Sequence, residues 1–313
     1  MQDIRLITSD EVKEVLTMPK AIDAMRQAFM DLSSGEAQVP DRLPLHTSQS
    51  DYLFMPAYYS SGGITTIKSV SINAENPKRG LPFIHALINV FENETGKPLA
   101  IVDGTEITAI RTAAASGLAT QIFSNPDARV GAIFGTGVQA KTHVEAILSV
   151  RKLDKILIFG SSLAKSKDFC EGYQPNCDVD LVATEEGHSL LEADVICTVT
   201  TSSSPVFKDG FIKKGAHINA VGVFKPDCHE IPIETVAAAD VYIDQLEGAL
   251  AEAGDLLIPM SKGLINQEHF SKEIGAVING DLSYRWSENK TTLFKSVGNA
   301  IQDAAAVAVL LTN

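Results

Sequence analysis

The most informative segment of this chain is the turn at residues 135–140, Gly-Thr-Gly-Val-Gln-Ala, because of the sequence on either side of it. The apolar run at 128–134 is typical of a buried parallel strand, and residues 141–148 carry apolar side chains at helical spacing. A strand, a glycine turn and a helix in this order place a pyrophosphate on backbone N–H groups at the positive end of a helix dipole. The pattern predicts a dinucleotide site in which Gly135 permits the tight turn and Gly137 lets the phosphate approach. The alternative is an ordinary turn between a strand and a helix.

Length and composition describe an acidic globular chain. The 313 residues are 45% hydrophobic and 21% charged, and the formal net charge of −13 argues against a nucleic-acid or anionic-membrane partner, which needs a basic face. The sequence has no basic stretch followed by an apolar one at its start and no run of about 18 apolar residues, so neither secretion nor a membrane span is expected. The four cysteines lack C-x-x-C spacing and no metal-ligand cluster is recognisable, so we expect free thiols, a cytoplasmic location and no metal.

The pattern of apolar residues changes along the chain. Two helices are predicted at 9–16 and 19–32, and short β-type runs separated by turns follow from 43 to 102, with no alternation of strand and helix. An alanine-rich helix is expected from 105 to 123. Beyond it, strands alternate with helical or loop segments, which is typical of a doubly wound parallel sheet. The expected strands are 129–134, 155–159, 193–200, 216–221 and 240–243, and the expected last helix is 293–311.

These segments indicate an α/β fold with two domains. Residues 116–299 are expected to form a Rossmann domain, a doubly wound parallel sheet that binds NAD(P). Residues 1–115 are expected to form an α+β domain. Because the last helix can return to pack on that domain, we include residues 300–313 in it and expect it to be discontinuous.

The cofactor preference is predicted from the end of the second Rossmann strand, at 155–159. The acidic residue that usually binds the adenosine ribose of NAD is absent there, and Ser161, Ser162 and Lys165 follow instead. Without a carboxylate a 2′-phosphate is not repelled, and these three side chains have donors for it. We therefore favour NADPH over NADH, with a solvated helix residue as the alternative role of Lys165.

Two further strand ends are expected to lie near the nicotinamide half of the cofactor. The first provides hydroxyl groups, although a run of Ser and Thr can equally be a polar loop. The second contains a glycine where backbone can approach a ring. The residues that we assign to this part of the site are Thr200, Thr201, Ser202, Val221, Gly222 and Val223.

The candidates for substrate chemistry in the first half of the chain are the cations Arg42, Lys68 and Arg111. Lys68 lies in a β-type run, where its neighbours on the same face are apolar or carry hydroxyl groups. Arg111 is the sole charge in a stretch of small residues, and its planar donors match both oxygens of a carboxylate. An ion pair of Arg111 with Asp103 or Glu106, or the capping of another helix, is the alternative.

Five motifs in the expected order carry a family resemblance, and the longest of them contains Arg111. The motifs are residues 80–82, 96–115, 135–140, 219–222 and 292–298. Together they resemble the ornithine cyclodeaminase/mu-crystallin family, over about residues 42–303. The resemblance implies a homodimer. It also implies that a substrate-binding and dimerisation domain is built from both chain ends around a central Rossmann domain.

The same resemblance implies roles for individual residues. Arg42, Lys68 and Arg111 are expected to surround the carboxylate and the reacting nitrogen of the substrate. The residues that the resemblance places against the dinucleotide are Val138, Gln139, Val221, Gly222, Ser296 and Val297.

Members of the family differ in activity, so the departures from its pattern carry the functional prediction. The members include ornithine cyclodeaminases, alanine dehydrogenases, cyclic ketimine reductases and thyroid-hormone-binding mu-crystallins. An aspartate that serves as acid and base in the cyclodeaminases, and is present in the archaeal alanine dehydrogenases, is Phe224 here. The lysine four residues further on is Cys228, and the carboxylate that cyclodeaminases carry before Met-Pro is Phe54. Oxidation of an amino acid therefore lacks its expected proton acceptor.

Reduction of a preformed C=N bond needs only a hydride, a clamp for the carboxylate and a proton for the nitrogen. Arg42 and Arg111 can form the clamp, Lys68 can polarise or protonate the nitrogen, and Phe224 can exclude water. We therefore expect an NAD(P)H-dependent oxidoreductase for a small cyclic imino acid, which reduces Δ1-pyrroline-2-carboxylate to L-proline and Δ1-piperideine-2-carboxylate to L-pipecolate. The alternatives are an amino-acid dehydrogenase of the alanine type, an ornithine cyclodeaminase, and an NADPH-dependent ligand-binding protein of the mu-crystallin kind.

Overall fold

The computed structural model describes residues 4–312, which fall into two compact units. The first unit consists of Met1–Arg111 and Gly298–Asn313, and the second consists of Thr112–Val297. The first division falls inside helix α3 (Gly104–Phe123). Each unit is built around its own seven-stranded sheet.

The sheet of the first unit is mixed. Its strands are β1 (Arg5–Ile7), β2 (Ala37–Gln38), β3 (Leu43–His46), β4 (Asp51–Tyr59), β5 (Ile64–Ile72), β6 (Ile84–Glu92) and β7 (Pro98–Asp103). The order is β1-β7-β6-β5-β4-β2, with β3 paired to β4, and only the pair of β1 and β7 is parallel. Burial alternates along β5 and β6, so one face of this sheet is covered and the other is more open.

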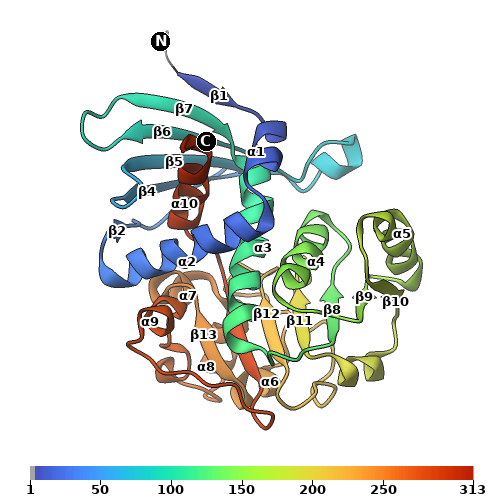
Figure 1. Cartoon of the computed structure of the whole chain (residues 1–313). Helices are drawn as coiled ribbons and strands as arrows, with labels where there is room; N and C mark the ends of the chain where they lie inside the picture. The colour runs from blue at the N-terminus through green and yellow to red at the C-terminus, as the bar shows by residue number, and fades with distance from the viewer. Residues whose placement is uncertain (1–3, 313) are drawn as a thin grey trace. The chain divides into compact units, whose positions relative to one another are not determined.

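Helices from both parts of the first unit cover the buried face of this sheet. Helix α10 (Ala300–Leu311) packs on β4 and β5, and α2 (Met18–Ser34) packs on α10 (Figure 1). Ile22, Met25 and Phe29 recur at helical spacing on the buried side of α2. The remaining short helices of this unit are α1 (Ser9–Val15) and η1 (Asn76–Arg79).

The sheet of the second unit is entirely parallel. Its strands are β8 (Val130–Phe134), β9 (Lys155–Phe159), β10 (Asp180–Ala183), β11 (Val195–Thr198), β12 (His217–Ala220), β13 (Asp240–Ile243) and β14 (Thr292–Lys295). They lie in the order β10-β9-β8-β11-β12-β14-β13. β11, β12 and β14 are buried along their whole length, which is typical of a parallel sheet covered on both faces.

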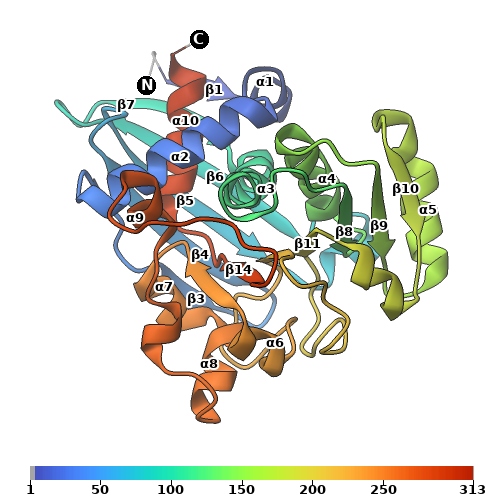
Figure 2. The same cartoon turned by 60° about the horizontal axis from the view of Figure 1, so that its bottom comes forward.

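Two apolar clusters cover the two faces of this parallel sheet. Figure 2 shows its strands β8, β9 and β10 side by side. Helices α4 (Val138–Val150) and α5 (Leu163–Tyr173) contribute Val144 and Phe169 to one cluster. Helices α6 (Ile233–Ala238) and α8 (Gly254–Ser261) contribute Val236 and Leu256 to the other. The remaining helices of this unit are α7 (Leu246–Glu252), α9 (Ile274–Asn279), η2 (Gln174–Asn176), η3 (Gly187–Glu192) and η4 (Gln267–Phe270).

The predicted fold class is confirmed, but the prediction of a helix over 293–311 is wrong. Thr292–Lys295 form the buried strand β14 between β12 and β13, and α10 begins only at Ala300. Gly298, with φ of 77°, and the extended Asn299 separate the two elements. Residues 292–295 are buried like those of the helix, and periodicity alone does not separate a short buried strand from a buried helix.

The edge strand β10 was not predicted, because only Leu181 of its four residues is buried. Among residues 4–312, every helix is too short or too polar to cross a membrane.

Candidate functional site

Lys68 is buried on the covered face of the sheet in the first unit. It lies on β5 between Met55 of β4 and Ile88 of β6, and only 1% of it is exposed. Its Nζ lies 2.6 Å from Asp303 Oδ2 on α10 and 3.5 Å from the hydroxyl oxygen of Thr108 on α3. Because a buried ammonium without a partner is costly, the ion pair with Asp303 is what makes this position tolerable for a lysine.

Arg111 reaches the same carboxylate from α3. Its Nε donates to Asp303 Oδ1 at 3.0 Å and its Nη1 donates to Gln302 Oε1 at 2.8 Å. The alternative in which Arg111 pairs with Asp103 or Glu106 is wrong, and Asp103 instead accepts two backbone N–H groups at the start of α3. Asp303 therefore joins both buried cations with separate oxygens.

Gly298 connects Arg111 with the third predicted cation, Arg42. The Nη2 of Arg42 donates to the carbonyl oxygen of Gly298 at 2.6 Å. Gly298 has φ of 77°, and a Cβ at this position would lie 2.6 Å from Arg111 Nη1. Glycine is therefore required here both for its backbone conformation and for the space that the guanidinium of Arg111 occupies.

The charged groups of this cluster act on Lys68 in opposite directions. Among the described residues, these groups are Arg42, Arg111 and the carboxylate of Asp303. Burial lowers the pKa of Lys68 from 10.5 to about 8; Asp303 raises this pKa, whereas Arg111 and Arg42 lower it. A bound anion beside these cations would favour the ammonium of Lys68.

Asp303 and Gln302 were not predicted as part of the site. They stand in the first turns of α10, whose remaining residues are apolar or small. A lone charge among small residues was the signal that identified Arg111, and Asp303 carries the same signal. We missed it because the segment 293–311 was interpreted as one continuous helix.

In the second unit, the predicted glycine turn lies between β8 and α4. Gly135 has φ of 123°, and its N–H donates to the carbonyl oxygen of Phe159 at 2.8 Å. Gly137 is the N-cap of α4, and a Cβ there would meet no atom within 4 Å. The N–H groups at the start of this 13-residue helix are therefore open to an anion such as a phosphate.

The next two residues of the turn also suit a dinucleotide. Val138 is an apolar residue with 68% of its surface exposed. Gln139 Oε1 is buried and has no hydrogen-bond partner within residues 4–312. A buried polar atom of this kind normally has a partner, so the local chemistry fits a bound group with donors, and NAD(P) fits the site.

The segment after β9 contains the residues predicted to bind a 2′-phosphate. Ser161, Ser162 and Lys165 are all exposed, and Ser162 Oγ accepts the backbone N–H of Lys165 at 3.4 Å as the N-cap of α5. Of these three residues, Lys165 lines a cavity of about 300 Å³. Its charged and hydroxyl lining residues are Thr136, Lys141, Lys165 and Asp168.

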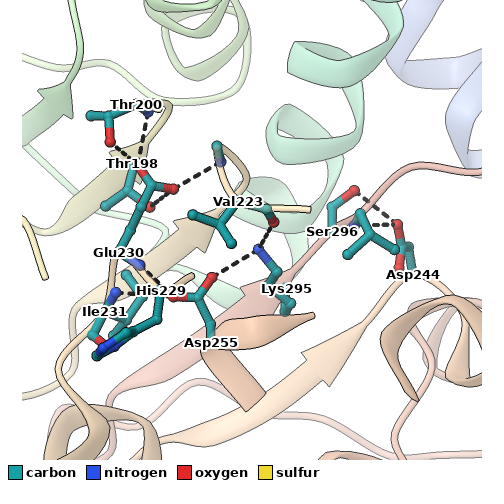
Figure 3. Close-up of polar contacts among 12 residues, drawn as sticks. Thr198, Thr200, Val223, His229, Glu230, Ile231, Asp244, Asp255, Lys295 and Ser296 are labelled. Atoms are coloured by element: carbon teal, nitrogen blue, oxygen red, sulfur yellow. Dashed lines mark hydrogen bonds and ion pairs between the residues drawn. The ribbon is translucent and has the colours of Figure 1, made fainter. Parts of the chain in front are cut away.

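The other predicted cofactor segments are joined by buried acidic residues (Figure 3). Glu230 is fully buried, and its Oε1 accepts both the N–H and the hydroxyl of Thr200 at 2.7 Å. Its Oε2 accepts the hydroxyl of Thr198 at 3.1 Å and the N–H of Gly222 at 2.8 Å. A Cβ on Gly222 would lie 2.2 Å from the carbonyl oxygen of Thr200, so only glycine fits. Thr201 and Ser202 continue the first of these segments, and the Ser202 N–H donates to Thr200 Oγ1.

Asp255 extends this arrangement to β14. Its Oδ1 accepts the N–H groups of Glu230 and Ile231, and its Oδ2 lies 2.8 Å from Lys295 Nζ. Lys295 is fully buried and also donates to the carbonyl oxygen of Val223 at 2.6 Å (Figure 3). The backbone after Gly222 is thus held by an ion pair that has no exposed surface.

Asp244 fixes the last predicted segment, Ser296 and Val297. Its Oδ2 accepts the Ser296 hydroxyl at 2.9 Å and the Val297 N–H at 3.0 Å. The sequence did not predict the buried charged residues that hold these segments. We call them the carboxylate frame, and they are Glu230, Asp255, Lys295 and Asp244. Lys295 could have been recognised as a cation within the apolar run of the motif 292–298, whereas the three acids lie in segments without a motif.

Within residues 4–312 no group of three or more His, Cys, Asp or Glu has the arrangement of a metal site.

Comparison with known proteins finds relatives along the whole chain. The model of the ornithine cyclodeaminase/mu-crystallin family matches residues 3–313. A Δ1-pyrroline-2-carboxylate reductase of Bacillus cereus is 34% identical over 302 residues, which cover 95% of this chain and 93% of the relative. The structure of Δ1-pyrroline-2-carboxylate reductase of Thermococcus litoralis, in complex with NADH and L-proline, matches with a TM-score of 0.94 and 34% identity, over 98% of this chain and 96% of that one. An archaeal alanine dehydrogenase, a dimer with bound NAD, matches with a TM-score of 0.92 and 31% identity, over 99% and 95%.

Replacement of Glu230 by glutamine tests the carboxylate frame. The amide keeps the size of the side chain but turns one acceptor into a donor that faces the N–H of Thr200 or Gly222. We expect the dissociation constant for NADPH or NADH to rise about tenfold or more, because a lost buried contact costs about 1–3 kcal/mol. Fluorescence titration measures the affinity. Glu234→Gln is the control, since Glu234 is exposed on α6, and equal affinities of the two variants would contradict the assignment.

Proposed function

The chain belongs to the ornithine cyclodeaminase/mu-crystallin family, and we propose that it reduces the C=N bond of a cyclic imine carboxylate with NAD(P)H. The proposed reactions are Δ1-pyrroline-2-carboxylate to L-proline and Δ1-piperideine-2-carboxylate to L-pipecolate. The observation that carries the proposal is the cluster of three cations, Arg42, Lys68 and Arg111, which suits a carboxylate beside a reacting nitrogen. Similarity to a reductase whose structure contains NADH and L-proline supports the same substrate class.

We assign the two roles to the two units. The first unit is proposed as the substrate-binding and dimerisation domain because it contains the cation cluster and the open sheet face. The second is proposed as the NAD(P)-binding domain because it contains the glycine turn and the carboxylate frame. The exact boundaries predicted from the sequence, 1–115 with 300–313 and 116–299, stay a prediction.

In the proposed mechanism, the arginines orient the substrate and Lys68 supplies the proton. Arg42 and Arg111 donate hydrogen bonds to the carboxylate, and the buried surroundings strengthen these charged contacts. The N–H bond that breaks at Lys68 Nζ is replaced by one at the imine nitrogen, and solvent restores the proton between turnovers. NAD(P)H, when bound, supplies the hydride for the imine carbon. The carboxylate frame holds the backbone at Thr200 and Gly222 for the cofactor.

In the competing activities, two positions are expected to hold proton-transfer groups that differ in this chain. Cyclodeamination and amino-acid oxidation require an acceptor for the proton of the substrate nitrogen or of water. The half-buried Phe224 stands where the aspartate is expected, and Cys228 stands where the lysine is expected. An alanine-type dehydrogenase is the second candidate, because of the similarity to the archaeal enzyme with bound NAD.

Substrate assays test the proposal directly. We expect oxidation of NADPH or NADH with Δ1-pyrroline-2-carboxylate and with Δ1-piperideine-2-carboxylate, measured by the loss of absorbance of the reduced cofactor. L-Ornithine with NAD, and L-alanine with NAD, are the parallel reactions. Faster formation of proline and ammonia from ornithine, or faster oxidation of alanine, would replace the proposed reaction. No turnover with any of them would favour a ligand-binding protein.

Lys68 is expected to be essential for this reduction. Lys68→Met keeps an apolar stem in the buried position but removes the proton, so turnover should fall by about two or more powers of ten while cofactor affinity stays near that of the wild type. In the wild type, activity should decline as the pH rises through about 8, because burial lowers the pKa of Lys68 and the ammonium loses its proton there. A variant with wild-type turnover would remove Lys68 from the mechanism.

We propose NADPH as the preferred cofactor, with NADH as the alternative. The support comes from the exposed Ser161, Ser162 and Lys165, and from a cavity that Lys165 lines together with Lys141. Two similar structures contain NADH or NAD, so the preference needs a direct test.

The test of cofactor preference compares two lysines on α5. Lys165→Ala should lower kcat/KM for NADPH about tenfold and leave that for NADH nearly unchanged, because only NADPH carries the 2′-phosphate. Lys167→Ala is the control, because Lys167 is equally exposed but does not line the cavity. Ser161→Asp should shift the preference further toward NADH by repulsion. An unchanged ratio in both Lys165→Ala and Ser161→Asp would show that the 2′-phosphate is not bound here.

We also propose a homodimer that forms through the open face of the first sheet, and a cytoplasmic location, which the four free cysteines support. Monomers rarely leave so many large apolar side chains on one sheet uncovered. The exposed apolar residues on these strands are Leu6, Leu43, Leu45, Tyr52, Tyr58, Ile67 and Leu87. The similar archaeal alanine dehydrogenase is a dimer.

A charge on this face should dissociate the dimer. Leu87 is 55% exposed on β6, inside the sheet rather than at its edge, and Leu87→Glu would bury a carboxylate in the interface. We expect the mass measured by light scattering to fall from two chains to one. Leu264→Glu is the control because Leu264 is 50% exposed in the second unit. A dimeric Leu87→Glu protein, or a monomeric wild type, would contradict the proposed interface.

A further inference from the structure

We propose that Asp303 is a positioning residue of the reduction, one that holds the Lys68 ammonium and the Arg111 guanidinium in a fixed arrangement and keeps Lys68 charged at neutral pH. The inference rests on the proposed function, because it concerns the proton that this function requires. It goes beyond that function because it assigns the charge state of the proton donor, Lys68, to a residue of the C-terminal helix. Asp303 does not contact the reacting atoms in this assignment.

The geometry separates the two tasks of the carboxylate. Oδ2 lies 2.6 Å from Lys68 Nζ, and Oδ1 accepts the hydrogen bond from Arg111 Nε at 3.0 Å. The side chain of Asp303 is 1% exposed, so water does not compete for either oxygen. Gln302 Oε1 supports the same guanidinium through Nη1 and also accepts the N–H of Asn299. Rotation of Asp303 would therefore break contacts with two cations together.

The surroundings of Lys68 leave Asp303 as its counter-charge. The neighbours of Lys68 on the sheet are the apolar Met55 and Ile88. From α3 it faces the Thr108 hydroxyl and the cation Arg111, and Arg42 adds a further positive charge. Among the described residues that act on Lys68, Asp303 is the single group that favours the ammonium over the neutral amine.

Removal of this carboxylate should therefore change the charge state of Lys68. Burial and the two arginines all favour the neutral amine, and without Asp303 nothing among these groups opposes them. A neutral Lys68 has no proton to give to an imine nitrogen at the pH where the wild type works. A residue that only attaches α10 to the sheet would instead change stability at every pH without moving the pH dependence of turnover.

Asp303→Asn is the variant that separates these possibilities, because it keeps the shape of the side chain and removes its charge. In the pH profile of kcat with Δ1-pyrroline-2-carboxylate, we expect the alkaline limb, where kcat declines, to move to lower pH by about one unit or more. Turnover should fall about tenfold or more at pH 8 and less at pH 6. Asp303→Glu keeps the charge and should leave the limb close to its wild-type position, even where turnover is reduced.

The matched control is Asp31→Asn. Asp31 is also a buried aspartate of the first unit, 6% exposed on α2, and it accepts a hydrogen bond from Gln27 at 2.9 Å. This substitution should lower the melting temperature without moving the alkaline limb. An unshifted limb in Asp303→Asn, or an equal shift in Asp31→Asn, would overturn the proposal.

A second measurement does not depend on activity. In protein labelled with ¹³Cε-lysine, the Lys68 signal is assigned by its absence in Lys68→Met, and its titration is followed by NMR. The midpoint should be lower in Asp303→Asn than in the wild type. A shifted midpoint in a protein that reduces no imine would leave the Lys68–Asp303 relation intact and remove the proposed function. An unshifted midpoint in an active enzyme would remove only the role of Asp303.

Discussion

The contacts of Asp303 with two buried cations are the interaction on which the first unit depends. An ammonium and a guanidinium in the same buried space lose hydration and repel each other, so they need a shared anion. Lys68 and Arg111 come from β5 and α3, whereas the anion comes from α10, 192 residues after Arg111. The return of the C-terminal helix to this unit therefore has an electrostatic cause in addition to the burial of its apolar residues.

The second unit uses buried carboxylates for a different purpose. Glu230 accepts hydrogen bonds from two loops, Asp255 pairs with Lys295, and Asp244 holds the start of the last segment. Burial raises the pKa of Glu230, while the hydrogen bonds of Thr200 and the charge of Lys295 oppose this change. Among the described residues, Lys295 pairs with Asp255 alone, whereas Lys68 and Arg111 share the carboxylate of Asp303. The buried charges of the two units thus differ in their arrangement.

The local patterns of the sequence were sufficient for much of this architecture. The glycine turn, the buried strands and the alanine-rich helix depend on short-range rules of backbone conformation and burial, and these were predicted near their observed ends. β14 was not predicted, because its extended form is set by its neighbours β12 and β13 rather than by its own apolar residues. Asp303 is a lone charge among small residues, but it lay in a segment predicted as one continuous helix. Glu230 and Asp255 were missed for a reason related to that of β14. Each acquires its role from partners that are distant in sequence, and a single buried acid has no local pattern.

The proton-transfer groups of the cation cluster suit the proposed reduction. The position where an acid–base aspartate is expected for amino-acid oxidation holds Phe224. Reduction needs an acid, and an ordinary lysine is a weak acid that holds its proton too tightly at neutral pH. Burial lowers the pKa of Lys68 to about 8, while Asp303 prevents a further fall. The ammonium is therefore present at neutral pH and gives up its proton more readily than an exposed lysine does. In a chain with a net charge of −13, the three cations of this cluster also make it a favourable place for the proposed anionic substrate.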